Sequence, residues 1–187
     1  MFILILGPPG AGKGTQGEIL ARRLGVPKIA TGDLLREAVR ANSPVGRRAK
    51  DYMDRGELVP DDVIVRLVEE HLNRNDAASG AVFDGFPRTI AQAEAVDQLL
   101  YGRDARLSHV LLFDVPEEEI ERRLLRRSSL EGRSDDDLPT IRRRLSVYQQ
   151  STAPLVAYYG KRGAVHRVRG VGTVDEVAEQ VRHIVGR

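Results

Sequence analysis

The stretch that decides the fold is Gly7-Pro8-Pro9-Gly10-Ala11-Gly12-Lys13-Gly14-Thr15, which follows an unbroken apolar run at Phe2–Leu6. An apolar run without alternation is typical of a central strand that is buried on both faces. From Lys13 to Leu24 the apolar residues recur at helical spacing, and Gly25 ends the pattern. A glycine-rich loop between a strand and a helix is the context of a phosphate-binding loop.

The chemistry of this loop suits an anion. Glycines let successive backbone N–H groups point inward and let oxygens approach with no Cβ in the way. The N-terminus of the next helix adds partial positive charge, and Lys13 adds a full one. A simple tight turn is the structural alternative, but four glycines and a lysine here favour phosphate. Gly14 stands where Ser or Thr is usual and Thr15 follows it, so the pattern supports a hydroxyl bound directly to Mg²⁺ less strongly.

The rest of the chain alternates short apolar runs with longer amphipathic ones, which predicts an α/β fold. We expect strands at 2–6, 28–30, 81–83, 109–113 and 165–168. We expect helices at 13–24, 32–41, 44–55, 60–73, 89–100, 116–127, 139–161 and 173–185, and a polar loop at 128–138. Pro154 should kink or split the longest helix. Five strands joined by helices imply one parallel sheet with right-handed crossovers.

The composition of the 187 residues fits one domain with small insertions. Hydrophobic residues make up 41% of the chain, enough for a core. No run approaches the ~20 apolar residues that cross a bilayer, and the N-terminal run enters Gly and Pro without a basic leader, so we expect no signal peptide. The absence of cysteine excludes disulfides, thiolate metal sites and cysteine nucleophiles, and it fits a reduced, cytoplasmic setting.

Arginine dominates the basic residues: only four of the 29 are lysines, and the formal net charge is +2. Arginine binds phosphate through a planar fork and stays protonated, which permits a polyphosphate or nucleic-acid ligand. A base composition that favours arginine codons is the alternative explanation for most of these residues. An aromatic content of 5% without tryptophan argues against a stacking platform for nucleic acid. The four histidines show no metal-ligand spacing.

Three further motifs follow: Thr31-Gly32-Asp33-Leu34-Leu35-Arg36, Gly56-Glu57-Leu58-Val59-Pro60-Asp61 and Asp84-Gly85-Phe86-Pro87-Arg88-Thr89. Asp84 directly follows an expected strand, at the sheet edge where ligands bind in open α/β folds. A carboxylate there can hold Mg²⁺ through its waters, and a helix cap is the alternative. Arg36 and Arg88 are candidate fork donors for a second phosphate, since no local carboxylate is expected to pair with them. Taken alone, either arginine is more commonly a solvated surface residue.

Together the loop, these three motifs, Gln92 and the arginine-rich C-terminal half resemble an adenylate kinase of the short-lid bacterial kind, over nearly the whole chain. The loop alone indicates only phosphate binding, whereas the four motifs together are highly specific for nucleoside monophosphate kinases. The resemblance implies a P-loop kinase core with a five-stranded parallel sheet flanked by helices. It assigns the core to 1–29, 60–126 and 138–187, a helical monophosphate-binding insertion to 30–59 and a short lid to 127–137. Because this lid has no cysteine, no zinc is implied.

The resemblance also assigns residues to two nucleotides. The ATP contacts it implies are Gly10, Ala11, Gly12, Lys13, Gly14, Thr15, Arg127 and Gly172. The AMP contacts are Thr31, Arg36, Glu57, Leu58, Val59, Gly85, Phe86, Pro87, Arg88, Gln92, Arg133 and Arg144. Lys13, Arg88, Arg123, Arg133 and Arg144 are the implied catalytic residues. Mg²⁺ is expected to arrive as MgATP and to lie near Asp84, Asp33 and Thr15 through waters.

Part of this assignment has a plain alternative. Arg122, Arg123, Arg126 and Arg127 form a basic helical face that solvation alone could explain. The choice of Arg123 and Arg127 among these four comes from the resemblance. The lid acids Asp135 and Asp136 are either partners of core arginines or plain loop acids.

The implied reaction is MgATP + AMP ⇌ MgADP + ADP. The sequence shows no heptad seam or spare apolar helix, so we expect a monomer. Phosphoryl transfer needs in-line positioning and positive charge rather than a protein nucleophile, which matches this inventory. Two alternatives stay open: a UMP/CMP kinase, against which Thr31 and Gln92 favour AMP, and a non-catalytic ATP-binding switch module. Gln92 lies one helical turn past Arg88, so its amide can accept from adenine N6 and donate to N1. An amide flip would match guanine instead, so rejection of GMP depends on neighbours that hold the amide.

Overall fold

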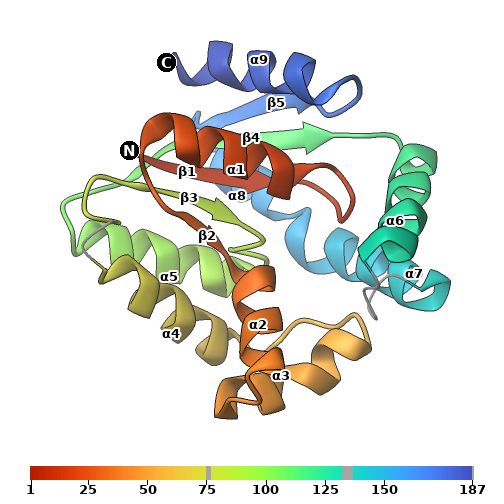
Figure 1. The fold of residues 1–187 in the computed structure, drawn as a ribbon. Helices are drawn as coiled ribbons and strands as arrows, with labels where there is room; N and C mark the ends of the chain where they lie inside the picture. The colour runs from red at the N-terminus through yellow and green to blue at the C-terminus, as the bar shows by residue number, and fades with distance from the viewer. Residues whose placement is uncertain (75–76, 132–136, 187) are drawn as a thin grey trace.

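The computed structural model describes residues 1–74, 77–131 and 137–186. Its centre is a five-stranded, all-parallel sheet in the order β2-β3-β1-β4-β5 (Figure 1). The strands are β1 (Phe2–Leu6), β2 (Lys28–Ala30), β3 (Ala81–Asp84), β4 (Leu107–Asp114) and β5 (Val165–Arg169). The predicted α/β class and the parallel sheet are confirmed.

Strand β1 shows why its apolar run does not alternate. Phe2, Leu4 and Leu6 belong to one hydrophobic cluster, and Ile3 and Ile5 belong to another on the opposite face of the sheet. Helices α4 (Asp61–Leu72), α5 (Ile90–Tyr101) and α8 (Leu155–Gly160) contribute to the first cluster, and α1 (Lys13–Leu24) and α9 (Val174–Val185) to the second. Helices therefore cover the sheet on both faces, as Figure 1 shows.

Helices α2 (Thr31–Arg40) and α3 (Pro44–Asp54) extend away from the sheet between β2 and α4 (Figure 1). Ser43 caps α3 by accepting a hydrogen bond from the backbone N–H of Gly46, and Pro44 follows it as the first residue of the helix. A Cβ at Gly46 would lie 2.0 Å from the Ala38 carbonyl oxygen, so only glycine allows this close contact between the two helices.

The structure corrects two expectations about the C-terminal half. Helix α6 (Glu117–Glu131) runs four residues beyond 127, so the loop expected from 128 onwards is wrong up to residue 131. Ser129 continues the helix and donates its hydroxyl to the Arg126 carbonyl at 2.8 Å, a local bond that serine makes in helices as well as in loops. Residues 132–136 of the expected loop and lid lie outside the described residues.

The long helix expected at 139–161 is split, as Pro154 predicts. It consists of α7 (Leu138–Val147), a π-helical segment η3 (Tyr148–Thr152) and α8. The backbone N–H of Ala153 bonds to the Tyr148 carbonyl five residues back, at 2.8 Å, and Pro154 has no N–H to continue the α-helical ladder.

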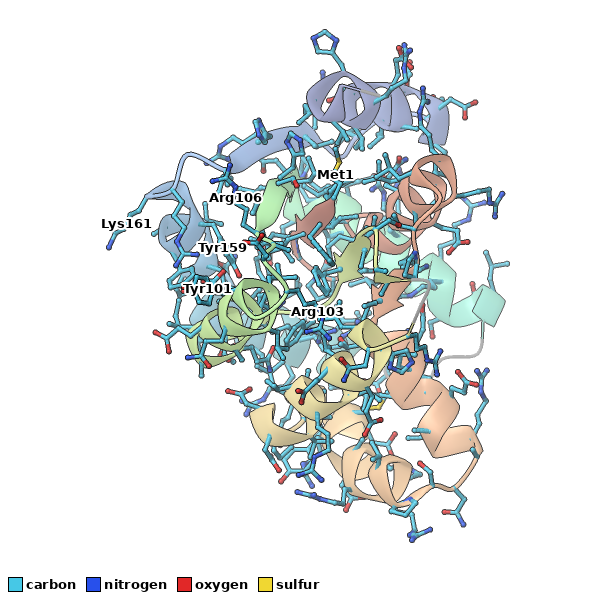
Figure 2. The ribbon with its side chains drawn as sticks, turned by 90° about the vertical axis from the view of Figure 1, so that its left-hand side faces the viewer. Met1, Tyr101, Arg103, Arg106, Tyr159 and Lys161 are labelled. Atoms are coloured by element: carbon cyan, nitrogen blue, oxygen red, sulfur yellow. The ribbon has the colours of Figure 1, made fainter. Side chains whose placement is uncertain are left out.

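The two ends of the sheet differ in what they carry. Figure 2 faces the end at which the strands begin, where Met1 and Arg106 directly precede β1 and β4. At the opposite end, the glycine-rich loop follows the carboxyl end of β1, and Asp84 is the last residue of β3 with Gly85 directly after it. In the described part of the chain, no helix has the length and apolar character needed to span a bilayer.

Candidate functional site

The glycine-rich loop lies between β1 and α1, as predicted, and packs against α6. Gly12 precedes α1 with φ of 88°, and no side chain caps this helix. Gly10 has φ of 80°, and a Cβ there would lie 2.9 Å from Leu124 Cγ. The loop is therefore pressed against its neighbour in a backbone shape that favours glycine, and the first N–H groups of α1 remain available to an anion.

Lys13 is the cation at the centre of this loop. Its Nζ donates to the Pro8 carbonyl oxygen at 2.7 Å. Burial lowers the pKa of Lys13 to about 8; Asp84 opposes this shift, whereas Arg88, Arg144 and Arg127 add to it. Mutually repelling cations that gather around one loop are stabilised by a polyanion, so this electrostatic pattern matches a phosphate chain.

A cavity of about 480 Å³ opens above the loop, and we call it the phosphate cavity. It brings together most of the predicted ATP-phosphate and magnesium residues with six arginines or lysines besides Lys13. Its predicted lining residues are Gly10, Ala11, Gly12, Lys13, Gly14, Thr15, Asp33, Arg36, Asp84, Gly85, Arg88, Arg123, Arg127 and Arg144. A Cβ at Gly14 would lie 3.5 Å from Asp84 Oδ2, so the Asp84 carboxylate faces the loop.

Next to the phosphate cavity lies a small pocket of about 70 Å³, which we call the inner pocket. The predicted residues that line it are Thr31, Arg36, Glu57, Leu58, Val59, Gly85, Arg88, Gln92 and Arg144. Pro87 lines an adjoining pocket that also contains Lys13, Arg88 and Arg144. Phe86 differs from these residues because it is fully buried in the core beside Phe83, with ring centroids 6.4 Å apart.

Gly85 organises one wall of the inner pocket. Its carbonyl oxygen accepts from the Thr31 hydroxyl at 2.8 Å and from Arg88 Nε at 2.7 Å. Its φ is 71°, and a Cβ on this residue would lie only 2.9 Å from Arg88 Nη2, so the position needs glycine. The Thr31 hydroxyl thus bonds to the backbone, and Gly85 orients the Arg88 guanidinium.

Arg36 corrects the expectation that no local carboxylate pairs with it. Its Nη2 lies 2.5 Å from Asp33 Oδ1, three residues earlier on α2. Residues three apart on a helix share a face, which accounts for the pair. Asp33 also lies 3.9 Å from Lys28 Nζ, so its carboxylate already balances two cations.

On the other side of the loop lies a larger cavity of about 530 Å³, the outer cavity, which Gly12, Thr15 and Gly172 help to line. Glu119 holds Arg123 on this side through a 2.6 Å contact between Oε1 and Nε, and it also bonds to Arg122. The basic face of α6 is thus partly organised by an acid on the same helix.

Arg133 is the one predicted site residue that lies outside the described residues, together with the lid acids Asp135 and Asp136. The structure brings the remaining predicted residues, apart from Phe86, to the phosphate cavity, the inner pocket with its neighbour, and the outer cavity. The contacts of these residues with nucleotides stay predictions. In the residues that are described, no group of three or more His, Asp or Glu side chains could hold a metal ion by itself.

Several residues that line these cavities or contact a lining residue had no predicted role. Asp61 and Thr89 stand at the ends of two quoted motifs, and both contact Gln92. Gln16 and Glu119 line the outer cavity. Lys28 lines the phosphate cavity and pairs with Glu18 at 3.0 Å. Asp61 and Thr89 could have been suspected from their place in the motifs, whereas the other three lack such a signal.

Comparisons with known proteins agree with this geometry. The family model described as adenylate kinase matches residues 5–164. An adenylate kinase of Thermus thermophilus is 54% identical over 184 residues, covering 98% of this chain and 96% of that protein. Adenylate kinases of Nocardia farcinica and Thermobifida fusca are 48% and 47% identical, covering 100% and 96% of this chain and 100% and 95% of their own lengths. This chain belongs to the adenylate kinase family.

Proposed function

We propose that the chain transfers the γ-phosphoryl group of MgATP to AMP in the reversible reaction MgATP + AMP ⇌ MgADP + ADP. The observation that carries this proposal is the phosphate cavity, in which the loop, Lys13 and several arginines converge between two further spaces. The outer cavity then takes the base of ATP, and the inner pocket takes AMP.

The residues act by position and charge. Backbone N–H groups of the loop and Lys13 hold the β- and γ-phosphates of ATP, and Arg88 with Arg36 holds the AMP phosphate. Arg144 lines the inner pocket and the phosphate cavity, where it can bridge the two nucleotides. An AMP phosphate is already anionic at neutral pH, so alignment and neutralisation of the equatorial oxygens suffice without a protein base.

The chemistry of the phosphate cavity also fits magnesium, which adenylate kinases receive with ATP. Asp84 presents a carboxylate toward the loop, and Thr15 and Asp33 add oxygen donors in the same cavity. Mg²⁺ favours such oxygen ligands and keeps several waters, so these residues would hold it through water. Once bound, it neutralises phosphate charge. Asp33 contributes less than Asp84 because it already pairs with Arg36.

We also propose that 30–59 and 127–137 move as an insertion and a lid on the core formed by 1–29, 60–126 and 138–187. Their closure would exclude water from the γ-phosphate and bring Arg133 to the site. The structure offers one supporting contact: Gly56 packs against α7, where its Cβ position is 3.0 Å from both Arg144 Cγ and Thr140 Cγ2. The insertion therefore reaches the arginine proposed to bridge the nucleotides.

An acceptor panel of AMP, CMP, UMP and GMP with MgATP tests the proposed function. We expect kcat/KM for AMP to exceed that for CMP and UMP by more than tenfold. Pyrimidine turnover within tenfold of AMP would favour a UMP/CMP kinase. Tight ATP binding without turnover of any acceptor would favour the switch module.

We further propose that the enzyme acts as a cytoplasmic monomer. Light scattering on the purified protein measures its molar mass in solution and so tests the monomer. Cell fractionation tests the location.

A further inference from the structure

One hydrogen-bond donor and one hydrogen-bond acceptor hold the side-chain amide of Gln92. Its Oε1 accepts from the backbone N–H of Arg88 at 2.7 Å, and its Nε2 donates to Asp61 Oδ1 at 2.6 Å. Gln92 is 1% exposed, so water does not compete freely for either contact.

This pairing gives the amide a single favourable orientation. A flip would place Nε2 against the Arg88 N–H, two donors facing each other, and would place Oε1 against the Asp61 carboxylate, two acceptors facing each other. Both hydrogen bonds would be lost in a buried position, where unpaired polar groups are costly. The orientation is thus set by the chemistry of its two partners.

Asp61 is itself held in place. It is the first residue of α4, and its Oδ2 accepts from the Thr89 hydroxyl at 3.0 Å. Thr89 caps α5, and its oxygen accepts from the backbone N–H of Gln92 at 3.1 Å. One carboxylate therefore joins the N-termini of two helices and directs one oxygen to the Gln92 amide.

A primary amide has two N–H groups and two lone pairs on its oxygen, and the described protein groups use one of each in Gln92. The remaining lone pair and N–H are available to a ligand in the inner pocket, which Gln92 lines. An adenine edge donates from N6 and accepts at N1, which matches this arrangement. A 6-oxopurine accepts at O6 and donates at N1, so it needs the flipped amide.

We propose that Asp61 is a positioning residue that makes the enzyme select 6-aminopurine over 6-oxopurine monophosphates by preventing the Gln92 flip. This inference rests on the proposed function, because it assumes that the inner pocket takes the base of AMP. Asp61 acts through Gln92 and does not itself touch the substrate.

The test compares AMP with inosine monophosphate, which differs from AMP only in the groups at positions 6 and 1 of the base. Asp61→Asn is the main variant because it is nearly isosteric, and an asparagine amide can donate to or accept from either orientation of Gln92. We expect the ratio of kcat/KM for AMP to that for inosine monophosphate to fall at least fivefold in Asp61→Asn and at least tenfold in Asp61→Ala.

Asp62→Asn is the matched control. Asp62 is the next residue in the first turn of α4, where it lies 3.8 Å from the exposed Arg48. Its substitution removes the same charge from the same helix end, so we expect the ratio to stay within twofold of wild type. Melting temperatures of all variants identify any loss of folding, and Asp61→Asn alone decides the question if Asp61→Ala does not fold.

The outcomes separate the two proposals. If wild type turns over AMP but the ratio in Asp61→Asn equals that in Asp62→Asn, Asp61 has only a structural role and the inference is overturned. If wild type does not turn over AMP, the proposed function fails. In that case, dissociation constants for AMP and inosine monophosphate in the same variants still test the positioning role: an unchanged ratio overturns it, and a fivefold fall supports it.

Discussion

The inner pocket and the outer cavity are each lined by a buried glutamine, but the two side-chain amides differ in their hydrogen bonds. Gln92 has both ends of its amide bonded, to Arg88 and Asp61. Gln16 donates Nε2 to the Val174 carbonyl at 2.8 Å, while its Oε1 is buried without a partner among the described residues. The inner pocket thus has a glutamine amide with a fixed pattern of donor and acceptor, whereas the glutamine of the outer cavity keeps a buried, unpaired oxygen. With the two nucleotides placed as proposed, we expect weaker selection of the donor base than of the acceptor base.

The largest expected effect concerns Lys13, which lines the phosphate cavity between the inner pocket and the outer cavity. Lys13→Ala should lower kcat at least 100-fold while the protein remains folded, because loss of one preorganised donor at a reacting phosphate costs about 3 kcal/mol or more. Steady-state kinetics with saturating MgATP and AMP measure this effect. Lys161→Ala, which changes an exposed lysine, is the control. Retention of more than half of the wild-type kcat would refute the role of Lys13.

Substitution of Gln92 should affect only the acceptor side. Gln92→Ala removes both proposed hydrogen bonds to the base and takes the glutamine amide away from the Arg88 N–H and Asp61 Oδ1, so kcat/KM for AMP should fall by about 10- to 100-fold. The advantage of AMP over CMP and UMP should narrow. The KM for ATP should stay within about twofold of wild type. An equal rise in KM for both nucleotides would contradict the separation of the two sides.

Substitution of Arg123 on α6 should affect the ATP side and leave the AMP side unchanged, with a smaller effect than that of Gln92→Ala. Arg123 lines both the phosphate cavity and the outer cavity, so Arg123→Ala should raise the KM for ATP by about fivefold and leave that for AMP unchanged. Arg122→Ala is the matched control, because Arg122 pairs with the same Glu119 but its side chain is 76% exposed, against 28% for Arg123. Equal effects of the two substitutions would support solvation of the whole basic face instead.

The fold was predictable because its signals are local. The unbroken apolar run at Phe2–Leu6, the glycines after it and the capping residues Ser43 and Thr89 each depend on neighbours in sequence. The end of α6 was not predictable in this way, since Ser128 and Ser129 suit a loop as well as a helix. The π-helical segment before Pro154 depends on how the backbone accommodates a missing N–H, which no local pattern specifies.

In the candidate site, too, the residues that depend on local sequence were predictable and those that depend on tertiary packing were not. The loop, Lys13 and Asp84 were predictable because they directly follow or end strands, and the Arg36–Asp33 pair could have been expected from its spacing of three residues. The partnership of Gln92 and Asp61 was not predictable, because the two residues lie 31 positions apart on different helices and meet only when α4 packs beside α5. A local motif can identify a site residue, but the contacts that orient its side chain depend on the tertiary packing of distant elements.

The smallest expected effect is a change of donor base, and it tests the comparison most directly. The unpaired Gln16 oxygen is buried, so no oriented amide like that of Gln92 is available to the donor base, and Arg123 can donate to a ring acceptor of either purine. We therefore expect kcat/KM for MgGTP to lie within about tenfold of that for MgATP, roughly 1.4 kcal/mol. On the acceptor side, replacement of AMP by inosine monophosphate should lower kcat/KM by more than tenfold, because Arg88 and Asp61 both oppose the flip of the Gln92 amide. Both ratios can be measured in one coupled assay on the wild-type enzyme. A larger penalty for GTP than for inosine monophosphate would reverse the inferred order and would mean that the outer cavity, despite its unpaired glutamine oxygen, is the more selective of the two.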